Sequence, residues 1–247
     1  MRTEKVELVV SGFKIRGTLC LPVEEKRRAV FVILHGLPFS PEPVEQKGYL
    51  DFAYMIVKRG AAAALLNLRG TDSSEGYFGL SAWVEDAEAY LRYLGSRLKG
   101  YKQYLLGFSA GGVVAIYVGA NNKEVAGVVS CSASYRPLSQ SVAKPLLERA
   151  LSASIIKGDR NPSFIERLLS EAERYSPSKC IISIAPRPIL IVHGRLDDLV
   201  PVEDAYKLYE EAKEPKKLLI LDAGHRLRAN PTDAEKIVEE AFLFINP

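Results

Sequence analysis

A serine lies between two glycines near the middle of the chain, where residues 107–111 read G-F-S-A-G. The short apolar run 104–106 precedes this segment, and the small-residue run 112–120 follows it with the character of a buried helix. A serine on a tight strand-to-helix turn has a strained backbone, and side chains at both glycine positions would collide with the turn. The pattern predicts that the hydroxyl of Ser109 projects above a sheet edge as a nucleophile. The alternative is an ordinary glycine-rich helix start.

A serine hydroxyl is a weak nucleophile near neutral pH, so it needs a general base and a carboxylate that orients that base. The chain has three histidines, His35, His193 and His225. The segment around Ser109 resembles the nucleophile segment of the α/β-hydrolase superfamily, in which the chain order is serine, acid, histidine. This order excludes His35, which precedes the serine. If His193 were the base, the acid would have to come from the insertion between the serine and His193. We therefore expect His225, just after the apolar run 218–221, to be the base.

The same order requires an acid after a strand, between the serine and the histidine. Residues 189–194 form an apolar run that Asp197 and Asp198 follow closely, and Asp222 lies at the end of another run. We select Asp197 and keep Asp198 and Asp222 as alternatives. An aspartate without this role would cap the helix expected after residue 201, or be solvated.

Acyl transfer also needs N–H donors that face the developing oxyanion. One donor follows from the nucleophile itself, because the amide of Ala110 comes directly after the serine. The second should come from the loop after the apolar run 29–34, which reads H-G-L-P. We expect Leu37, because Pro38 has no N–H, and keep Gly36 as the alternative.

The resemblance to the α/β-hydrolase superfamily extends over nearly the whole chain. Residues 193–201, H-G-R-L-D-D-L-V-P, and residues 223–225, A-G-H, resemble the acid and histidine segments of that family. The short opening hairpin and the segment A-P-R-P at 185–188 are similar to dienelactone-hydrolase-like and prolyl-oligopeptidase-like single-domain hydrolases. Two departures limit the likeness: position 109 is serine where dienelactone hydrolases have cysteine, and the lipase signature HGGG is absent. Fold-level analogy does not name a substrate.

Runs of strand length and stretches of helical periodicity alternate along the chain. This alternation predicts an α/β fold with a doubly wound, mostly parallel sheet of about eight strands. The expected strands are 6–10, 13–21, 29–34, 62–66, 104–106, 125–129, 189–192 and 218–221. The expected helices are 49–58, 82–98, 113–119, 202–212 and 234–244.

The alternation breaks once, between about residues 130 and 186, where two helical patterns occur without a strand. We interpret 1–247 as a single domain in which 131–185 contains a helical lid insertion; two ordinary packed helices are the alternative. From their position, four residues of this segment are expected to shape an apolar acyl pocket. They are Leu151, Ile155, Phe164 and Leu168.

Composition excludes several classes of protein. The chain of 247 residues is 47% hydrophobic and carries a formal net charge of only +3, so nothing favours nucleic-acid binding. The three cysteines have no spacing typical of a metal site or a disulfide framework. We expect no metal or cofactor, reduced thiols, no membrane insertion and, without an export signal, a cytoplasmic location. Homo-oligomerisation stays open.

These observations together predict a serine hydrolase that cleaves carboxylic esters of small to medium acyl groups through an acyl-enzyme. The partner expected is a small-molecule acyl substrate. The same residues would serve a thioesterase, a small-peptide hydrolase or an acyltransferase. Outside enzymes, the alternative is a catalytically silent binding scaffold.

Overall fold

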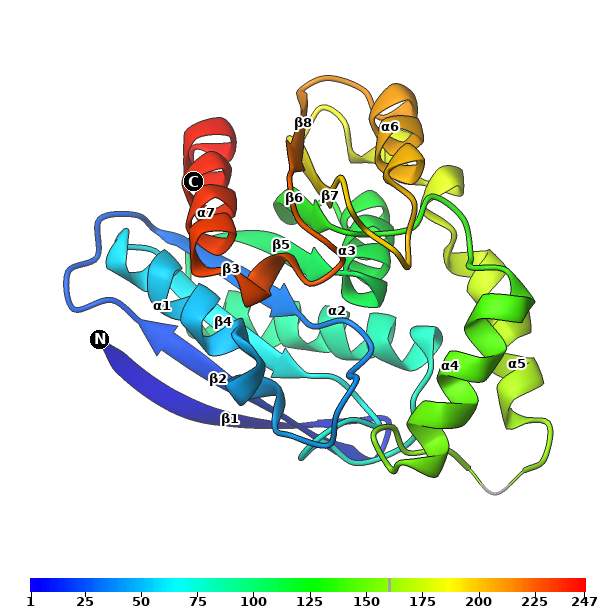
Figure 1. Cartoon of the computed structure of the whole chain (residues 1–247). Coiled ribbons are helices and arrows are strands. Elements are labelled where there is room, and N and C mark those ends of the chain that lie inside the picture. Colours follow the sequence, from blue (N-terminus) through cyan, green and yellow to red (C-terminus); the bar gives the residue numbers. More distant parts are fainter. Residues whose placement is uncertain (160) are drawn as a thin grey trace.

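The computed structural model, which describes residues 1–159 and 161–247, is built around one eight-stranded sheet (Figure 1). Its strands are β1 (Arg2–Val10), β2 (Phe13–Leu21), β3 (Ala29–Leu34), β4 (Ala62–Asn67), β5 (Lys102–Phe108), β6 (Val125–Cys131), β7 (Ile189–Gly194) and β8 (Lys216–Leu221). Their order across the sheet is β1-β2-β4-β3-β5-β6-β7-β8. β1 and β2 form an antiparallel hairpin, β2 is also antiparallel to β4, and the other neighbouring pairs are parallel. The predicted doubly wound, mostly parallel sheet is confirmed.

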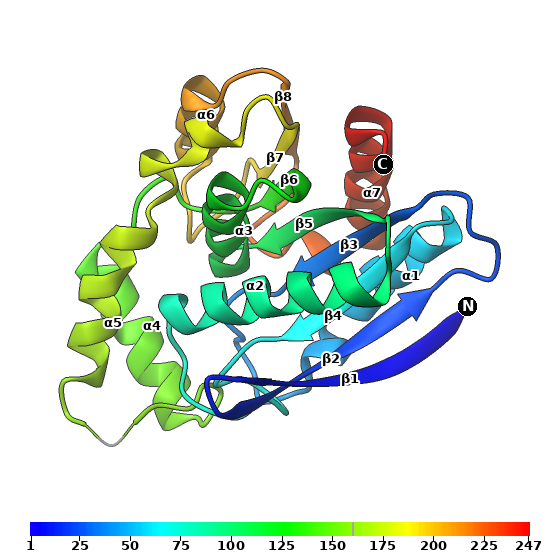
Figure 2. The ribbon, with the colours of Figure 1, turned by 180° about the vertical axis from the view of Figure 1, so that it is seen from behind.

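Helices cover both faces of this sheet. They are α1 (Tyr49–Lys58), α2 (Leu80–Arg97), α3 (Ala110–Asn121), α4 (Gln140–Ser152), α5 (Phe164–Ala172), α6 (Val202–Glu211) and α7 (Pro231–Ile245). Short 3-10 helices are η1 (Val44–Lys47), η2 (Glu173–Tyr175), η3 (Pro177–Lys179), η4 (Ile181–Ile184) and η5 (Leu227–Ala229). α1 and α7 pack on one face, and α2, α3 and α6 on the other, so each face has its own apolar core (Figures 1 and 2).

The central strands position the functional loops. β3 and β4 are buried along their whole length, as expected of strands with helices on both sides. Parallel strands end at one edge of a sheet, so the loops after β3, β5, β7 and β8 meet there. The loop after β3, the turn from β5 into α3 and the loops after β7 and β8 contain the residues singled out from the sequence.

The segment between β6 and β7 contributes two helices, α4 and α5, that pack against each other. In both ribbon views they stand beyond the carboxyl ends of the central strands (Figures 1 and 2). The connection between them is anchored to the β4–α2 segment, because the Phe78 amide donates to the Lys157 carbonyl at 2.8 Å and the Lys157 amide to the Gly70 carbonyl at 2.7 Å. A second anchor is Glu171 of α5, whose Oε1 accepts the Leu80 amide of α2 at 2.8 Å. Both predicted helices are present, and their interpretation as a lid insertion stays a prediction.

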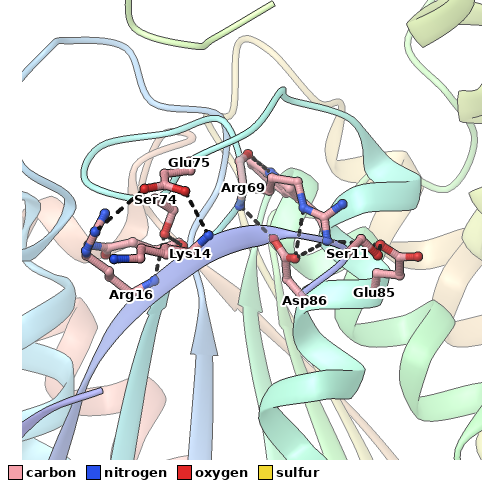
Figure 3. A network of polar contacts seen from close by, with 10 residues as sticks. Ser11, Lys14, Arg16, Arg69, Ser74, Glu75, Glu85 and Asp86 are labelled. Carbon is pink, nitrogen blue, oxygen red and sulfur yellow. Dashed lines mark hydrogen bonds and ion pairs between the residues drawn. The ribbon is translucent and has the colours of Figure 1, made fainter. Parts of the chain in front are cut away.

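A buried polar cluster fixes the loop after β4 (Figure 3). The Arg69 amide and its guanidinium Nη2 each donate to the Asp86 carboxylate at 2.7 Å, and Nη2 also contacts Glu85 at 2.9 Å. The Arg69 carbonyl accepts the Trp83 indole N–H at 2.9 Å. Burial raises the pKa of Asp86 to about 6, against the opposing effect of the Arg69 guanidinium. This cluster joins the β4 loop to α2, and α2 in turn is joined to α5.

Candidate active site

Ser109 lies at the turn between β5 and α3. Its backbone angles are φ 52° and ψ −121°, a conformation that residues other than glycine rarely adopt. The glycines on either side have a steric cause. A Cβ on Gly107 would lie 2.1 Å from the Gly111 carbonyl oxygen, and one on Gly111 would lie 2.3 Å from the Leu34 carbonyl oxygen. Both positions therefore require glycine: at Gly107 the clash is within the turn, as the sequence predicted, and at Gly111 it is with the end of β3.

His225 and Asp197 complete a hydrogen-bonded chain with this serine. The Nε2 atom of His225 lies 3.0 Å from Ser109 Oγ, and its Nδ1 lies 2.8 Å from Asp197 Oδ2. With a carboxylate on one side, Nδ1–H donates to Asp197, which leaves Nε2 to accept the serine proton. The structure thus brings together the three side chains selected from the sequence, although they lie on three different loops.

The Asp197 side chain is fully buried, and its carboxylate is held by donors on several sides. Oδ1 accepts the amides of Leu199 at 3.0 Å and Val200 at 2.8 Å, while Oδ2 faces both His225 and His193. Burial by itself raises the pKa of Asp197, but the hydrogen bonds from His193, His225 and Val200 outweigh it and hold the pKa well below its usual range. Asp197 is therefore a carboxylate near neutral pH. In the described part of the chain, the alternatives Asp198 and Asp222 form no hydrogen bond or ion pair with the histidine.

His193 contacts the same carboxylate, a role that the sequence analysis missed. Its Nε2 lies 2.9 Å from the Val200 carbonyl and 3.2 Å from Asp197 Oδ2, and the ring is fully buried. Because a carbonyl can only accept, the ring proton belongs on Nε2, which is shared between these two oxygens. The spacing of four residues between histidine and aspartate across the β7 turn was the signal that could have indicated this contact.

His35 lies away from the hydrogen-bonded chain and holds backbone in place. Its Nδ1 is 2.7 Å from the Gly36 carbonyl, and its Nε2 accepts the Leu68 amide at 3.0 Å. The ring thereby joins the loop after β3 to the loop after β4. It is excluded as the base by geometry as well as by chain order.

The two amides expected to stabilise an oxyanion lie beside the serine. Leu37 and Ala110 line the same cavity as Ser109, and neither amide donates a hydrogen bond within residues 1–159 and 161–247. The alternative donor, Gly36, is already engaged, because its N–H donates to the Tyr49 hydroxyl at 3.0 Å. This geometry favours Leu37 over Gly36, and the stabilising role itself stays a prediction.

An apolar cavity of about 170 Å³ opens beside Ser109. Helices α4 and α5 form much of its wall, with Ala143 and Leu147 from the first and Leu168 and Leu169 from the second. Of the four residues predicted to shape an acyl pocket, Leu168 does line this cavity. The prediction is wrong for Leu151, Ile155 and Phe164, which lie outside its lining.

Two of the three excluded residues, Leu151 at the end of α4 and Phe164 at the start of α5, pack at the connection between these helices. A Cβ on Gly158 would lie 2.6 Å from Leu151 and 2.7 Å from Phe164, so both surround that glycine. α4 ends at Ser152, and Ile155 therefore lies beyond the helix in a turn. The apolar stripe seen in the sequence continues past the end of the helix, where the next residue, Ile156, forms an isolated β-bridge with Thr71 of the loop after β4.

No group of three metal-binding side chains occurs among the residues that the structure describes, and none of their helices is long and apolar enough to cross a membrane. Cys20 and Cys131 are buried and Cys180 is half-buried, and all three are free thiols. Burial raises the pKa of Cys20 and Cys180 to about 11, so these thiols are poor nucleophiles at neutral pH.

Comparison with known proteins agrees with this geometry. A family model described as "Serine aminopeptidase, S33" matches residues 25–183, which include the turn at Ser109. The chain belongs to this family of α/β hydrolases. The hydrolase also matches the uncharacterized protein YfhR of Salmonella typhimurium, with 30% identity over 175 residues. That match covers 68% of this chain and 56% of YfhR, so the chain spans little more than half the length of this relative.

Solved structures share the fold over almost the whole hydrolase. The esterase domain of a Rhodothermus marinus protein has 21% identity and a TM-score of 0.74, covering 97% of this chain and 95% of that one. The Pyrococcus furiosus esterase Pf2001 has 22% identity and a TM-score of 0.72, covering 99% of this chain and 92% of the other. Est1E of Butyrivibrio proteoclasticus, solved with ferulic acid, has 17% identity and a TM-score of 0.73, with 98% of each chain covered. At these identities the likeness concerns the fold alone.

Proposed function

We propose that this α/β hydrolase cleaves carboxylic esters of small to medium acyl groups through Ser109, His225 and Asp197. The observation that carries the proposal is the continuous chain of hydrogen bonds, 3.0 Å from Ser109 Oγ to His225 Nε2 and 2.8 Å from His225 Nδ1 to Asp197 Oδ2. It starts at a strained turn beside an apolar cavity. A serine, a base and a buried carboxylate in this order are the parts that nucleophilic acyl transfer requires.

In the acylation step, Ser109 Oγ attacks the ester carbonyl carbon while His225 Nε2 takes the hydroxyl proton. Asp197 keeps the imidazole in the required tautomer and stabilises its positive charge. The carbonyl oxygen becomes an oxyanion facing the amides of Leu37 and Ala110. As the carbon–oxygen bond to the alcohol breaks, Nε2 returns the proton to the leaving oxygen. A water molecule then attacks the acyl carbon while Nε2 takes its proton, and Nε2 passes that proton to Ser109 Oγ as the bond from the carbon to Oγ breaks and the acid leaves.

The cavity beside the serine supports an apolar acyl group. Its volume of about 170 Å³ suits a small to medium acyl chain. Apolar surface transferred from water into such a cavity contributes roughly 25 cal/mol per Å² to binding. The wall residues Val113, Leu147 and Leu168 offer no group that could pair with a charge.

Peptide hydrolysis is the second candidate, and the family description favours it. An aminopeptidase must hold the free ammonium group beside the scissile carbonyl, and an ammonium removed from water needs a carboxylate partner. Glu171 is the carboxylate in the lining of the cavity, within the described residues. Its two oxygens already accept the Leu80 amide at 2.8 Å and the Ser81 hydroxyl at 2.9 Å. The lining therefore supports an ester better than an N-terminal amino acid.

Kinetics on p-nitrophenyl esters test the proposal. Ser109→Ala is expected to lower kcat for p-nitrophenyl butyrate by at least ~10³-fold with an unchanged thermal unfolding temperature, because the three residues act as a unit. The matched control is Ser134→Ala, which removes another hydroxyl from the cavity lining and should change kcat by less than about threefold. Faster turnover of alanine p-nitroanilide than of the butyrate ester would favour the peptidase. Equal activity of Ser109→Ala and the wild type would reject both.

A further inference from the structure

A second depression, of different character, lies on the other side of the candidate active site. Phe39 and Leu199 belong to the linings of both hollows and stand between them. Ser109 lines the first, apolar cavity, whereas His225 lines the second. The Phe39 ring meets the His225 ring edge-on, with 6.4 Å between the ring centres. The two substrate portions on either side of a scissile bond would therefore meet different surfaces.

The proposed chemistry decides which portion lies on which side. The acyl carbon bonds to Ser109, so the acyl group occupies the cavity that this serine lines. The leaving oxygen must receive its proton from His225 Nε2, so the alcohol portion lies toward the histidine. The second depression, which His225 lines, is thus on the leaving-group side.

Carboxylates outnumber cations in this second lining. Asp198, Asp222 and Asp233 all contribute to it, and Arg226 is the cation among its described residues. Asp222 is paired with Arg195, from outside the lining, at 2.9 Å. The Arg226 guanidinium lies 5.0 Å from the centre of the Phe39 ring. No cation in the described residues forms an ion pair with Asp198 or Asp233.

Of the three aspartates in this lining, Asp233 is buried, whereas Asp198 and Asp222 are exposed. It is only 8% exposed, and within residues 1–159 and 161–247 it forms neither a hydrogen bond nor an ion pair. It lies in the first turn of α7, where the helix dipole favours a negative charge. The cap of that helix is already supplied by Asn230, whose Oδ1 accepts the Thr232 amide at 2.9 Å. The Asp233 oxygens are not among the buried atoms without a partner, so they remain accessible, and Asp233 lines the depression. A carboxylate without a protein partner at this position favours a cation that enters the depression.

We propose that this depression is a leaving-group subsite that selects esters whose alcohol portion carries an ammonium group, with Asp233 as its main anionic contact. The inference rests on the proposed ester hydrolysis and adds a substrate class to it: an apolar acyl group joined to a cationic alcohol. Phe39 and Leu199 separate the two halves of such a substrate.

Two isosteric esters test this selection. Butyrylcholine and 3,3-dimethylbutyl butyrate share the acyl group and differ in one atom, a quaternary nitrogen in the first and a carbon in the second. The wild-type protein is expected to hydrolyse butyrylcholine with a kcat/KM at least about tenfold higher, as expected of one contact to a charged group. Asp233→Asn should bring the ratio of the two kcat/KM values to about one, while kcat/KM for the neutral ester stays within about threefold.

The matched control is Glu235→Gln on the same helix, which removes a carboxylate that pairs with Arg59 and lies outside the depression. It should leave the ratio unchanged. Since the neutral ester reports on folding and chemistry in every variant, loss of structure in Asp233→Asn would show as equal losses on both esters. In that case Asp233→Glu, which keeps the charge, must retain the wild-type preference.

The outcomes separate the two proposals. A wild-type ratio near one, with the neutral ester hydrolysed, overturns the subsite and leaves the hydrolase. A tenfold preference that survives Asp233→Asn also overturns it. If neither ester nor p-nitrophenyl butyrate is hydrolysed, the proposed function itself fails.

Discussion

Substitution of His193 tests how the buried carboxylate is held. Asp197 faces four donors: His225 Nδ1 at 2.8 Å, His193 Nε2 at 3.2 Å, and the amides of Leu199 at 3.0 Å and Val200 at 2.8 Å. His193→Phe fills a similar volume and removes one of these donors. A hydrogen bond to a charged group contributes ~1.5–3 kcal/mol. Because the His193 proton is shared with the Val200 carbonyl, we expect the lower end, a fall of about tenfold in kcat/KM.

His193→Gln is the matched control. A glutamine amide can place a nitrogen donor near the position of Nε2, so most of the kcat/KM for p-nitrophenyl butyrate should be recovered. Acid unfolding gives a second measurement. Because the pKa of folded Asp197 lies below its ordinary value, its carboxylate stabilises the fold above pH ~4, and this contribution is lost as the pH falls. In His193→Phe that pKa rises toward its ordinary value, so unfolding should begin at a higher pH than in the wild type or in His193→Gln.

The reasoning is refuted by either of two results. One is a His193→Phe protein with wild-type kcat/KM and an unchanged acid-unfolding midpoint. The other is a His193→Gln protein whose kcat/KM and resistance to acid unfolding fall as far as those of His193→Phe. That result would assign the effect to packing of the ring and not to its N–H donor.

Three further substitutions test other parts of the structure. Asp86→Ala removes the buried partner of an arginine and should lower the free energy of unfolding in urea by ~3–5 kcal/mol, whereas the exposed partner Glu85→Ala should cost less than ~1 kcal/mol. Gly107→Ala places a Cβ 2.1 Å from a backbone oxygen of α3 and should both destabilise the fold by at least ~1–3 kcal/mol and abolish ester hydrolysis, as calorimetry and kinetics would show. Ala143→Phe narrows the acyl cavity and should shift the kcat/KM ratio of p-nitrophenyl octanoate to butyrate toward butyrate; Leu151→Ala, outside the lining, should leave that ratio unchanged.

Local patterns in the sequence were sufficient to predict the parts of the site that depend on local geometry. At Gly107 the steric reason acts within the turn, through the Gly111 carbonyl, whereas at Gly111 it comes from the end of β3; the G-x-S-x-G pattern records both requirements in the chain. The buried strands are visible as continuous apolar runs, because helices cover each of them on both faces. Helix starts were placed less well. α3 begins at Ala110, directly after the serine, and α7 begins at Pro231, because proline is favoured in the first turn of a helix.

The lining of the acyl cavity could not be predicted in this way, because it depends on contacts between distant parts of the chain. The face that α5 turns toward the serine is fixed where Glu171 binds the Leu80 amide, 91 residues earlier in the chain. The connection between α4 and α5 is fixed where Lys157 binds Gly70. An apolar stripe in the sequence shows that a helix is buried, and not what it is buried against. The contact of His193 with the acid likewise depends on how tightly the turn after β7 closes.

Labelling with a fluorophosphonate tests the central claim most directly. The reagent phosphonylates a serine that a neighbouring base activates, and mass spectrometry of the digested protein locates the adduct. The account predicts one equivalent of label on Ser109, loss of ester hydrolysis in step with labelling, and no adduct in His225→Ala. Complete retention of hydrolysis with Ser109 unlabelled, or an adduct on another residue that abolishes it, would contradict the account.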